Sequence, residues 1–289
     1  MNVMAPTNIL FESTKVQEYV EEVKNTLDKS HRKYKRKMRN VIITGATSGI
    51  GKAFALLMLR KGNNVVLNGR SLTRMNRVIK EAKNLSGNFE VVLGDCFEQE
   101  VISNMIYACK IKFDGLPNLC LVNAGRGLPG TLATSDDSQW ESLFNINVLA
   151  VLKQLKYFSA CMMEDVSTET LFSKKKDIVV IGSSIGRNVS PFNPIYGATK
   201  SAVHSATEAL RREVGPQGVR VSLIEPGIVR SGFQETAGYD AEWFKKYVEE
   251  IGPVLSPDDI AITVKFITDL PPHVHANNVM IRPTRQAYP

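Results

Sequence analysis

Tyr196 and Lys200 lie four residues apart, so a helix over this segment would place both side chains on one face. A tyrosine hydroxyl has a reference pKa of about 10 and exchanges protons poorly at neutral pH unless its anion is stabilised. A nearby ammonium group stabilises that anion, and we expect Lys200 to lower the pKa of Tyr196. The spacing predicts a phenol that works as a general acid or base. It also fits an ordinary aromatic–lysine pair on a helix surface, so it needs support from other residues.

A glycine-rich segment, Thr44-Gly45-Ala46-Thr47-Ser48-Gly49-Ile50-Gly51, follows the first apolar run of the chain. A sharp turn needs residues without Cβ, and a helix start offers unpaired N–H groups and a positive dipole end to a pyrophosphate. Because the segment follows a predicted strand and opens a predicted helix, it has the context of a dinucleotide-binding loop. The residues expected to contact the dinucleotide are Gly45, Thr47, Ser48, Gly49, Ile50 and Gly51.

The segment Asn68-Gly69-Arg70-Ser71 indicates which dinucleotide binds. An acidic residue about 20 residues beyond the loop would accept a hydrogen bond from the ribose 2′-hydroxyl of NAD. Here Gly69 brings no carboxylate that would repel a 2′-phosphate, and Arg70 supplies a planar guanidinium that suits one. We therefore expect NADP(H) as the cofactor, with Asp95 placed to bond the adenine amino group. Lys52 and Arg74 are candidates for additional positive charge.

Apolar runs rich in β-branched residues alternate with amphipathic helical segments along the chain. The predicted strands are Asn40–Thr44, Asn64–Leu67, Glu90–Leu93, Asn118–Asn123, Asp177–Ile181, Val219–Glu225 and Val279–Arg282. The predicted helices include Ile50–Lys61, Ser71–Leu85, Ser138–Met163 and Ile195–Val214, and a polar insert over Glu164–Lys176 is predicted to be a surface loop. This alternation predicts an α/β fold, a Rossmann-like doubly wound parallel sheet with helices on both faces, in a single domain over residues 40–289.

Residues 1–39 form a separate basic segment. They carry nine Lys and Arg against five Asp and Glu, within a net charge of +7 for the chain. An apolar stripe at helical spacing predicts an N-terminal helical extension, and its members are Val16, Tyr19, Val20, Val23 and Leu27. The basic run could make a peripheral contact with an anionic membrane surface, whereas the stripe favours packing against the domain or a partner subunit. Nucleic acid is not an expected partner, because few aromatic residues accompany the charges.

The composition excludes several classes of protein. Hydrophobic residues make up 43% and charged residues 22% of the chain, a balance typical of soluble proteins. No apolar run approaches the roughly 20 residues of a membrane span, and the N-terminus lacks the pattern of a secretory signal. The four cysteines are widely spaced, which favours buried free thiols in a reducing, cytoplasmic location. The four histidines are too scattered to predict a metal site.

Several motifs occur together in the order and spacing of one known family. They are Gly45-x-x-x-Gly49-x-Gly51, Asn123-Ala124-Gly125, Asn147, Ser183, Tyr196-x-x-x-Lys200 and Pro226-Gly227. Each is weak alone, but together they resemble the short-chain dehydrogenase/reductase family over Asn40 to Arg282. The resemblance implies an oxidoreductase that interconverts a carbonyl and a secondary alcohol by hydride transfer, with Tyr196 as the catalytic acid/base.

The resemblance also implies roles for the other catalytic residues. Ser183 would hydrogen-bond the substrate oxygen, since it lies 13 residues before Tyr196 and three before Gly186, whereas Ser184 is out of register. Lys200 would also hold the nicotinamide ribose, and Asn147 would hold a water that links the lysine to solvent. The family residues expected beside the cofactor are Asn123, Ala124, Gly125, Tyr196, Lys200, Pro226, Gly227, Val229 and Ser231.

The substrate and the partners are less constrained. The segments after Ser183 and Gly227 should build the substrate pocket, and they contain Arg187, Arg230, Phe233, Tyr239 and Trp243. Either arginine could bind a substrate carboxylate, or both could face solvent or the cofactor phosphates. Similarity to reductases of small 3-hydroxy acids suggests that substrate class, and a 3-oxoacyl reductase is the alternative. An NADPH-binding sensor or scaffold is a further alternative of another class. Family members form homodimers or homotetramers through two long helices, here 138–163 and 195–214.

Overall fold

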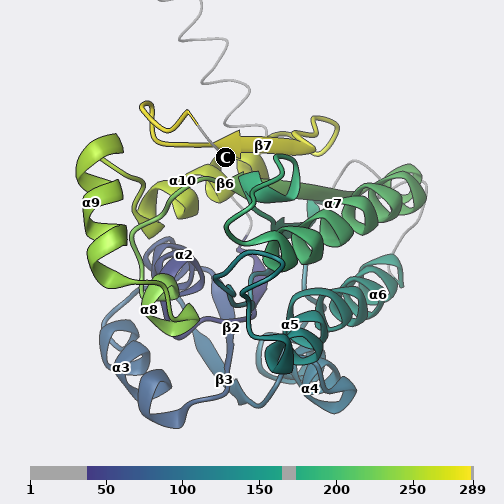
Figure 1. The fold of residues 1–289 in the computed structure, drawn as a ribbon. Helices are drawn as coiled ribbons and strands as arrows, with labels where there is room; N and C mark the ends of the chain where they lie inside the picture. The colour runs from purple at the N-terminus through teal and green to yellow at the C-terminus, as the bar shows by residue number, and fades with distance from the viewer. Residues whose placement is uncertain (1–37, 165–173, 288–289) are drawn as a thin grey trace, which may run out of the picture. The chain divides into compact units, whose positions relative to one another are not determined.

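The computed structural model describes residues 38–164 and 174–287, and Figure 1 shows their arrangement. They form one parallel sheet with the strand order β3-β2-β1-β4-β5-β6-β7. The strands are β1 Asn40–Ile43, β2 Asn64–Gly69, β3 Phe89–Leu93, β4 Leu119–Val122, β5 Lys176–Ile181, β6 Val219–Pro226 and β7 Asn278–Ile281. The helices are α2 Gly49–Arg60, α3 Leu72–Ala82, α4 Gln99–Lys112, α5 Trp140–Phe144, α6 Ala150–Met163, α7 Pro194–Val214, α8 Phe233–Ala237, α9 Ala241–Ile251 and α10 Pro257–Asp269.

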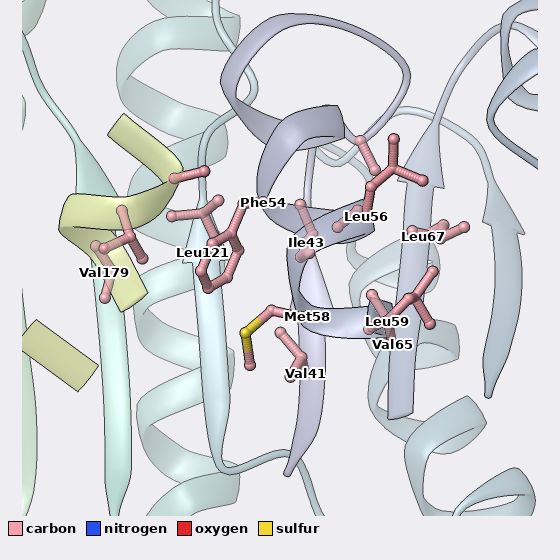
Figure 2. Close-up of a cluster of buried hydrophobic side chains, with 14 of the residues drawn as sticks. Val41, Ile43, Phe54, Leu56, Met58, Leu59, Val65, Leu67, Leu121 and Val179 are labelled. Carbon is pink, nitrogen blue, oxygen red and sulfur yellow. The ribbon is translucent and has the colours of Figure 1, made fainter. Parts of the chain in front are cut away.

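Successive side chains of the central strands enter two different cores. Val41 and Ile43 of β1 pack with α2, α3 and α10, and Figure 2 shows part of this core around Phe54 and Leu59. Ile42, between them in sequence, packs instead with α4, α6 and α7. This alternation follows from the pleat of a strand that is covered on both faces, which is why these strands read as continuous apolar runs.

The chain winds outward from β1 to β3 and then restarts at β4 on the other side of β1. In such a sheet a crevice opens at the carboxyl ends of the strands where the winding direction reverses. Here that point lies between β1 and β4. The glycine-rich segment follows β1 there, and Asn123 follows β4. The fold thus brings two predicted cofactor segments, 78 residues apart in sequence, into hydrogen-bond contact at Asn123 and Gly45.

The predicted fold class and single domain are confirmed, and the strands agree with the predicted ranges to within about two residues. The predicted helical stretch over 138–163 is confirmed, and it contains a π-helical turn, Asn145–Leu149, between α5 and α6, which the sequence did not predict. The buried amide of Asn147 bonds to backbone groups of Arg126 outside the helix, and we attribute the local widening to this anchoring. The N-terminal extension up to Lys37 and residues 165–173 of the polar insert lie outside the described residues.

A buried cluster of charge ties the amino-terminal edge of the sheet together. Asp177 of β5 forms ion pairs with Arg39 at 2.6 Å and with Arg220 of β6 at 2.7 Å. The carboxylate is 3% exposed and Arg220 is 6% exposed. Arg220 also donates hydrogen bonds to the carbonyl oxygens of Leu270 and Pro271. A buried pair of this kind stabilises little in itself, but loss of one partner leaves an uncompensated charge.

Replacing Asp177 with asparagine is therefore expected to lower the free energy of unfolding by about 3–5 kcal/mol, because two buried guanidinium groups lose their carboxylate. Urea denaturation of the purified variant measures this loss. Glu81→Gln is the matched control, since Glu81 pairs with Lys52 on the surface at 2.7 Å and is 47% exposed. The control should cost only about 0–1 kcal/mol. Equal small losses for both variants would contradict the prediction.

All four cysteines are free and buried, as the sequence predicts. Burial raises the pKa of Cys96 and of Cys109 to about 12, so neither thiol forms a thiolate at neutral pH. These residues therefore belong to the packed interior rather than to a reactive site. Within residues 38–164 and 174–287, no helix combines the length and the apolar character needed to cross a membrane.

Candidate active site

Tyr196, Ser183 and Lys200 meet at the carboxyl end of β5. Tyr196 lies in the first turn of α7, which begins with Pro194, and Lys200 follows one turn later on the same face. Ser183 comes just after β5, and its Oγ accepts a hydrogen bond from Ile185 N–H at 3.4 Å, which starts a short 3₁₀ turn over Ser184–Gly186. The Ser183 side chain lies close enough to the Tyr196 hydroxyl to lower its pKa. The structure thus places Ser183, rather than the buried Ser184, against the tyrosine.

The pKa of Tyr196 is shifted upward, opposite to the shift predicted from the sequence. Burial raises it, because the phenolate would lose its hydration, and the neighbouring Ser183 side chain only partly offsets this effect. Burial also lowers the pKa of Lys200 to about 8. Lys200 Nζ lies 5.8 Å from the centre of the Tyr196 ring and donates to the Ile181 carbonyl at 2.9 Å. In the protein alone, Tyr196 therefore carries its proton at neutral pH.

Asn147 is held by protein groups on two sides. Its Oδ1 accepts a hydrogen bond from Arg126 N–H at 2.9 Å, and its Nδ2 donates to the Arg126 carbonyl at 2.8 Å. The same Nδ2 donates to Thr199 Oγ1 at 3.1 Å. The amide therefore joins the segment after β4 to α7, directly beside Lys200. Sequence reasoning missed Thr199, although its position immediately before Lys200 was a usable signal.

The glycine-rich segment forms a closely packed turn between β1 and α2. Gly45 has a φ of +67° and Gly49 a φ of +51°, conformations that favour glycine. At Gly51 a Cβ would overlap the Gly45 carbonyl and lie 2.6 Å from Asn123 Nδ2. Asn123 itself donates to the Thr44 carbonyl at 3.0 Å, so its side chain braces the turn. The Ser48 side chain makes no cap bond at the start of α2, so the N–H groups there keep the character of an anion site.

Arg70 and Asp95 lie together at the ends of β2 and β3. Their side chains form an ion pair at 3.5 Å, and Arg70 is 71% exposed. Gly69 has a steric role that the sequence did not reveal, because a Cβ there would lie 2.5 Å from Thr47 Cγ2. Lys52, a candidate for extra charge, pairs instead with Glu81. Arg70 therefore stays exposed beside the loop although it already has one partner, and Arg74 is exposed as well.

The segment after β6 returns to the glycine-rich turn. Gly227 N–H donates to the Ile281 carbonyl at 2.8 Å, and Val229 pairs with Leu255. A Cβ built on Gly49 would lie 3.7 Å from Cβ of Ser231, so the two predicted cofactor segments face each other. Gln286 was missed by sequence reasoning, and its Oε1 accepts from Ile228 N–H at 2.9 Å. The C-terminal segment thus holds this loop in place.

Aromatic side chains cover the tyrosine. The Phe233 ring of α8 lies 5.8 Å from that of Tyr196, tilted by 57°, and Tyr196 is 8% exposed. Asn193 Nδ2 donates to Tyr239 Oη at 3.0 Å. Trp243, also predicted for this wall, stacks on Tyr247 and stays half-exposed. Phe233 and Tyr239 therefore line the space next to Tyr196.

Arg187 lies partly in solvent, one of the alternatives considered from the sequence, and it is also held by an ion pair. Its guanidinium donates two hydrogen bonds to the buried carboxylate of Glu225, at 2.8 and 2.6 Å. This bidentate pair joins the segment after β5 to the end of β6 and uses one edge of the guanidinium, Nε and Nη2. Arg230 is exposed. Both arginines therefore remain candidates to bind an acidic group, although the charge of Arg187 is already paired.

The comparisons with known proteins agree with this arrangement. The pattern of the short chain dehydrogenases matches residues 39–242. An uncharacterized oxidoreductase of Staphylococcus aureus is 31% identical over 242 residues, which cover 84% of this chain and 96% of that protein. Dehydrogenase/reductase SDR family member 11 of Bos taurus is 31% identical over 258 residues, which cover 86% of this chain and 97% of that protein.

Solved structures share the fold at lower identity. The closed form of a serine dehydrogenase complexed with NADP⁺ has a TM-score of 0.75 and 24% identity, covering 86% of this chain and 96% of that one. A 3-ketoacyl-(acyl-carrier-protein) reductase from Brucella melitensis complexed with NADH has a TM-score of 0.73 and 23% identity, covering 86% and 98%. These structures share the fold, while the matched pattern and the relatives above 30% identity identify the family. The chain is an oxidoreductase that belongs to the short-chain dehydrogenase family.

Proposed function

We propose that this protein is an NADP(H)-dependent reductase that converts a carbonyl to a secondary alcohol, with Tyr196 as the proton donor. The observation that carries the proposal is that Tyr196 is buried at the carboxyl end of the sheet, with the side chains of Ser183 and Lys200 beside it. Lys200 lies on the same helix face, with its Nζ 5.8 Å from the centre of the Tyr196 ring and 3.9 Å from a Cβ built on Gly125. Reduction of a carbonyl needs a protonated donor at the oxygen, and burial keeps Tyr196 in that form.

The residues of the crevice fit a dinucleotide. The turn at Gly45, Gly49 and Gly51 brings bare backbone to the start of α2, where N–H groups and the helix dipole favour the pyrophosphate. Asn123, Ala124 and Gly125 would border it from β4, and the segment from Pro226 to Ser231 would close over it. Bound NADPH would supply the hydride for the carbonyl carbon.

The remaining side chains have roles at the proton and at the substrate oxygen. Ser183 Oγ would donate a second hydrogen bond to the carbonyl oxygen and so fix it against the Tyr196 hydroxyl. Lys200, when charged, would stabilise the tyrosinate left after proton transfer and hold the ribose. Asn147 would act on this pair through Thr199 and through the Arg126 segment that it anchors. Each role is assigned to a side chain within the contacts described above.

The preference for NADPH over NADH rests on Arg70. Arg70→Ala is expected to weaken NADPH binding about 10- to 100-fold, since a charge-assisted bond to the 2′-phosphate contributes about 1.5–3 kcal/mol. NADH binding should change little. Titrations that follow the fluorescence of each nucleotide measure both affinities. Arg77→Ala, an exposed arginine of α3, is the control and should leave both unchanged. Equal losses for the two nucleotides in Arg70→Ala would contradict the assignment.

Gly69 is a poor position for a second test, because any side chain there would meet Thr47.

The substrate class is best tested with a small panel of carbonyl compounds. We propose a small 3-hydroxy acid and its 3-oxo counterpart, or a similar polar substrate, with a 3-oxoacyl thioester as the second candidate. Because the charge of Arg187 is already paired with Glu225, we favour Arg230 as the arginine that would recognise an acid. The panel should therefore compare a 3-oxo acid, its thioester and a neutral ketone, by the loss of NADPH absorbance. Turnover of the thioester or the ketone alone would refute the acid proposal, and turnover of none would refute the proposed function.

We also infer a homodimer or homotetramer. The apolar residues that α5, the π-helical turn and α6 leave exposed support this, namely Phe144, Leu149 and Leu152. They lie on the 138–163 segment that the family resemblance assigned to an interface. Sedimentation of the purified protein at the mass of one chain would refute the inference.

A further inference from the structure

His204 lies one helical turn beyond Lys200 and faces the turn that carries Ser183. β5 ends at Ile181, and Gly182 N–H still donates to the Ile224 carbonyl of β6 at 2.8 Å. The next N–H, that of Ser183, donates to His204 Nε2 at 3.3 Å. An imidazole side chain of α7 thus serves as the acceptor for a backbone group just past the strand.

The turn around Ser183 is shaped to accept the imidazole ring. A Cβ at Gly182 would overlap His204 Nε2, and a Cβ at Gly186 would lie 2.5 Å from His204 Cε1. Neither glycine has a positive φ, so backbone conformation does not require glycine at these two positions. The close approach of the ring does require it. The ring therefore fills the inside of the turn, with the serine backbone between the two glycines.

The ring is neutral at neutral pH, as an acceptor at Nε2 must be. Burial, opposed by the charge of Glu225 and assisted by the charges of Lys200 and Arg187, lowers the pKa of His204 to about 4. Since Nε2 faces an N–H donor, the proton of the neutral ring belongs on Nδ1. Because His204 Nε2 remains an acceptor at neutral pH, it holds the backbone of Ser183 in one position.

We infer that His204 is a positioning residue that fixes the Ser183 hydroxyl against Tyr196 and the substrate carbonyl. The inference rests on the proposed role of Ser183. His204 touches neither the substrate nor the reacting atoms in this account, and it acts only through the serine backbone. Because a misplacement of about 1 Å can cost about 10²-fold in rate, loss of this anchor should reduce turnover.

Three variants test the inference. His204→Leu removes the acceptor, and we expect kcat for carbonyl reduction to fall about 10- to 100-fold while NADPH affinity stays unchanged. His204→Gln places an acceptor oxygen close to the position of Nε2, and it should keep kcat within about threefold of the wild type. If His204→Leu does not fold, His204→Asn, whose shorter side chain falls short of Ser183 N–H, takes its place. Full activity of the variant without an acceptor in reach would overturn the inference.

A double-mutant cycle separates positioning from packing. In a Ser183→Ala background there is no hydroxyl to position, so His204→Leu should cause almost no further loss of kcat. If the loss persists at full size, or if glutamine fails to rescue it, His204 acts through general packing and the inference is wrong. A Ser183→Ala variant with wild-type activity would instead refute the proposed serine role, so the two failures are distinguishable.

Discussion

Replacing Tyr196 with phenylalanine is expected to lower kcat for carbonyl reduction by about 10²–10⁴-fold, the usual contribution of a general acid. The change removes only the hydroxyl, so the ring keeps its contact with Phe233 and its place in α7. The affinity for NADPH should stay near that of the wild type, because the glycine-rich turn and Arg70 are untouched. Steady-state rates together with a fluorescence titration of NADPH measure the two quantities separately.

Tyr239→Phe is the matched control for this variant. Tyr239 is a second tyrosine beside Tyr196, half-buried and bonded to Asn193 at 3.0 Å. Losing its hydroxyl should raise KM at most modestly and should spare kcat, since no proton passes through it in the proposed reaction. A Tyr196→Phe enzyme with substantial residual turnover, or a Tyr239→Phe enzyme that is equally impaired, would move the acid role away from Tyr196.

Replacing Lys200 with methionine is expected to have the second largest effect. At the 5.8 Å between Nζ and the ring centre, one charge is worth roughly 3 kcal/mol at an effective dielectric constant of about 20. We therefore expect kcat to fall by about 10²-fold through loss of the charge, and NADPH binding to weaken as well through loss of the ribose contact. Methionine keeps most of the volume and the apolar stem, so packing should change little. Rates and NADPH titrations at neutral pH check both expectations.

The pH dependence gives Lys200→Met a distinct signature. Burial lowers the pKa of Lys200 to about 8, so its charged form is present below pH 8 and is lost as pH rises through that value. Tyr196 stays protonated there, because burial raises its pKa. The rate of reduction by the wild type should accordingly fall as pH rises through about 8, and this step should be absent in Lys200→Met. Lys200→Arg, which stays charged, should also lack the step. An unchanged step in either variant would assign the titration to another group.

The sequence was sufficient for the strand segments, for the fold class and for several residues that meet at the site. Strands buried on both faces are recognisable as apolar runs, and motifs such as Tyr196-x-x-x-Lys200 fix local spacing. The sequence was insufficient where a contact joins distant segments. The π-helical turn within the 138–163 helix accompanies the bonds between Asn147 and Arg126, 21 residues away, and Arg187 is held by Glu225, 38 residues away.

The direction of the Tyr196 pKa shift illustrates the same limit in electrostatic terms. From the sequence, the charge of Lys200 is visible and favours the phenolate, whereas burial under Phe233 is not visible. In the structure burial dominates, and it acts on the lysine as well. His204 was missed for a related reason. Its ring packs against Gly182 and Gly186, which lie in the turn after β5 and not on the helix of His204 itself.

The most direct test of the central claim follows hydride from the nicotinamide to the substrate. The purified protein is incubated with the carbonyl panel and NADPH that carries deuterium at the transferable position, and the products are analysed by mass spectrometry. We expect the wild type to form an alcohol with one deuterium on the former carbonyl carbon, and Tyr196→Phe not to form it. Oxidation of NADPH without a labelled alcohol, or equal labelling by both proteins, would contradict it.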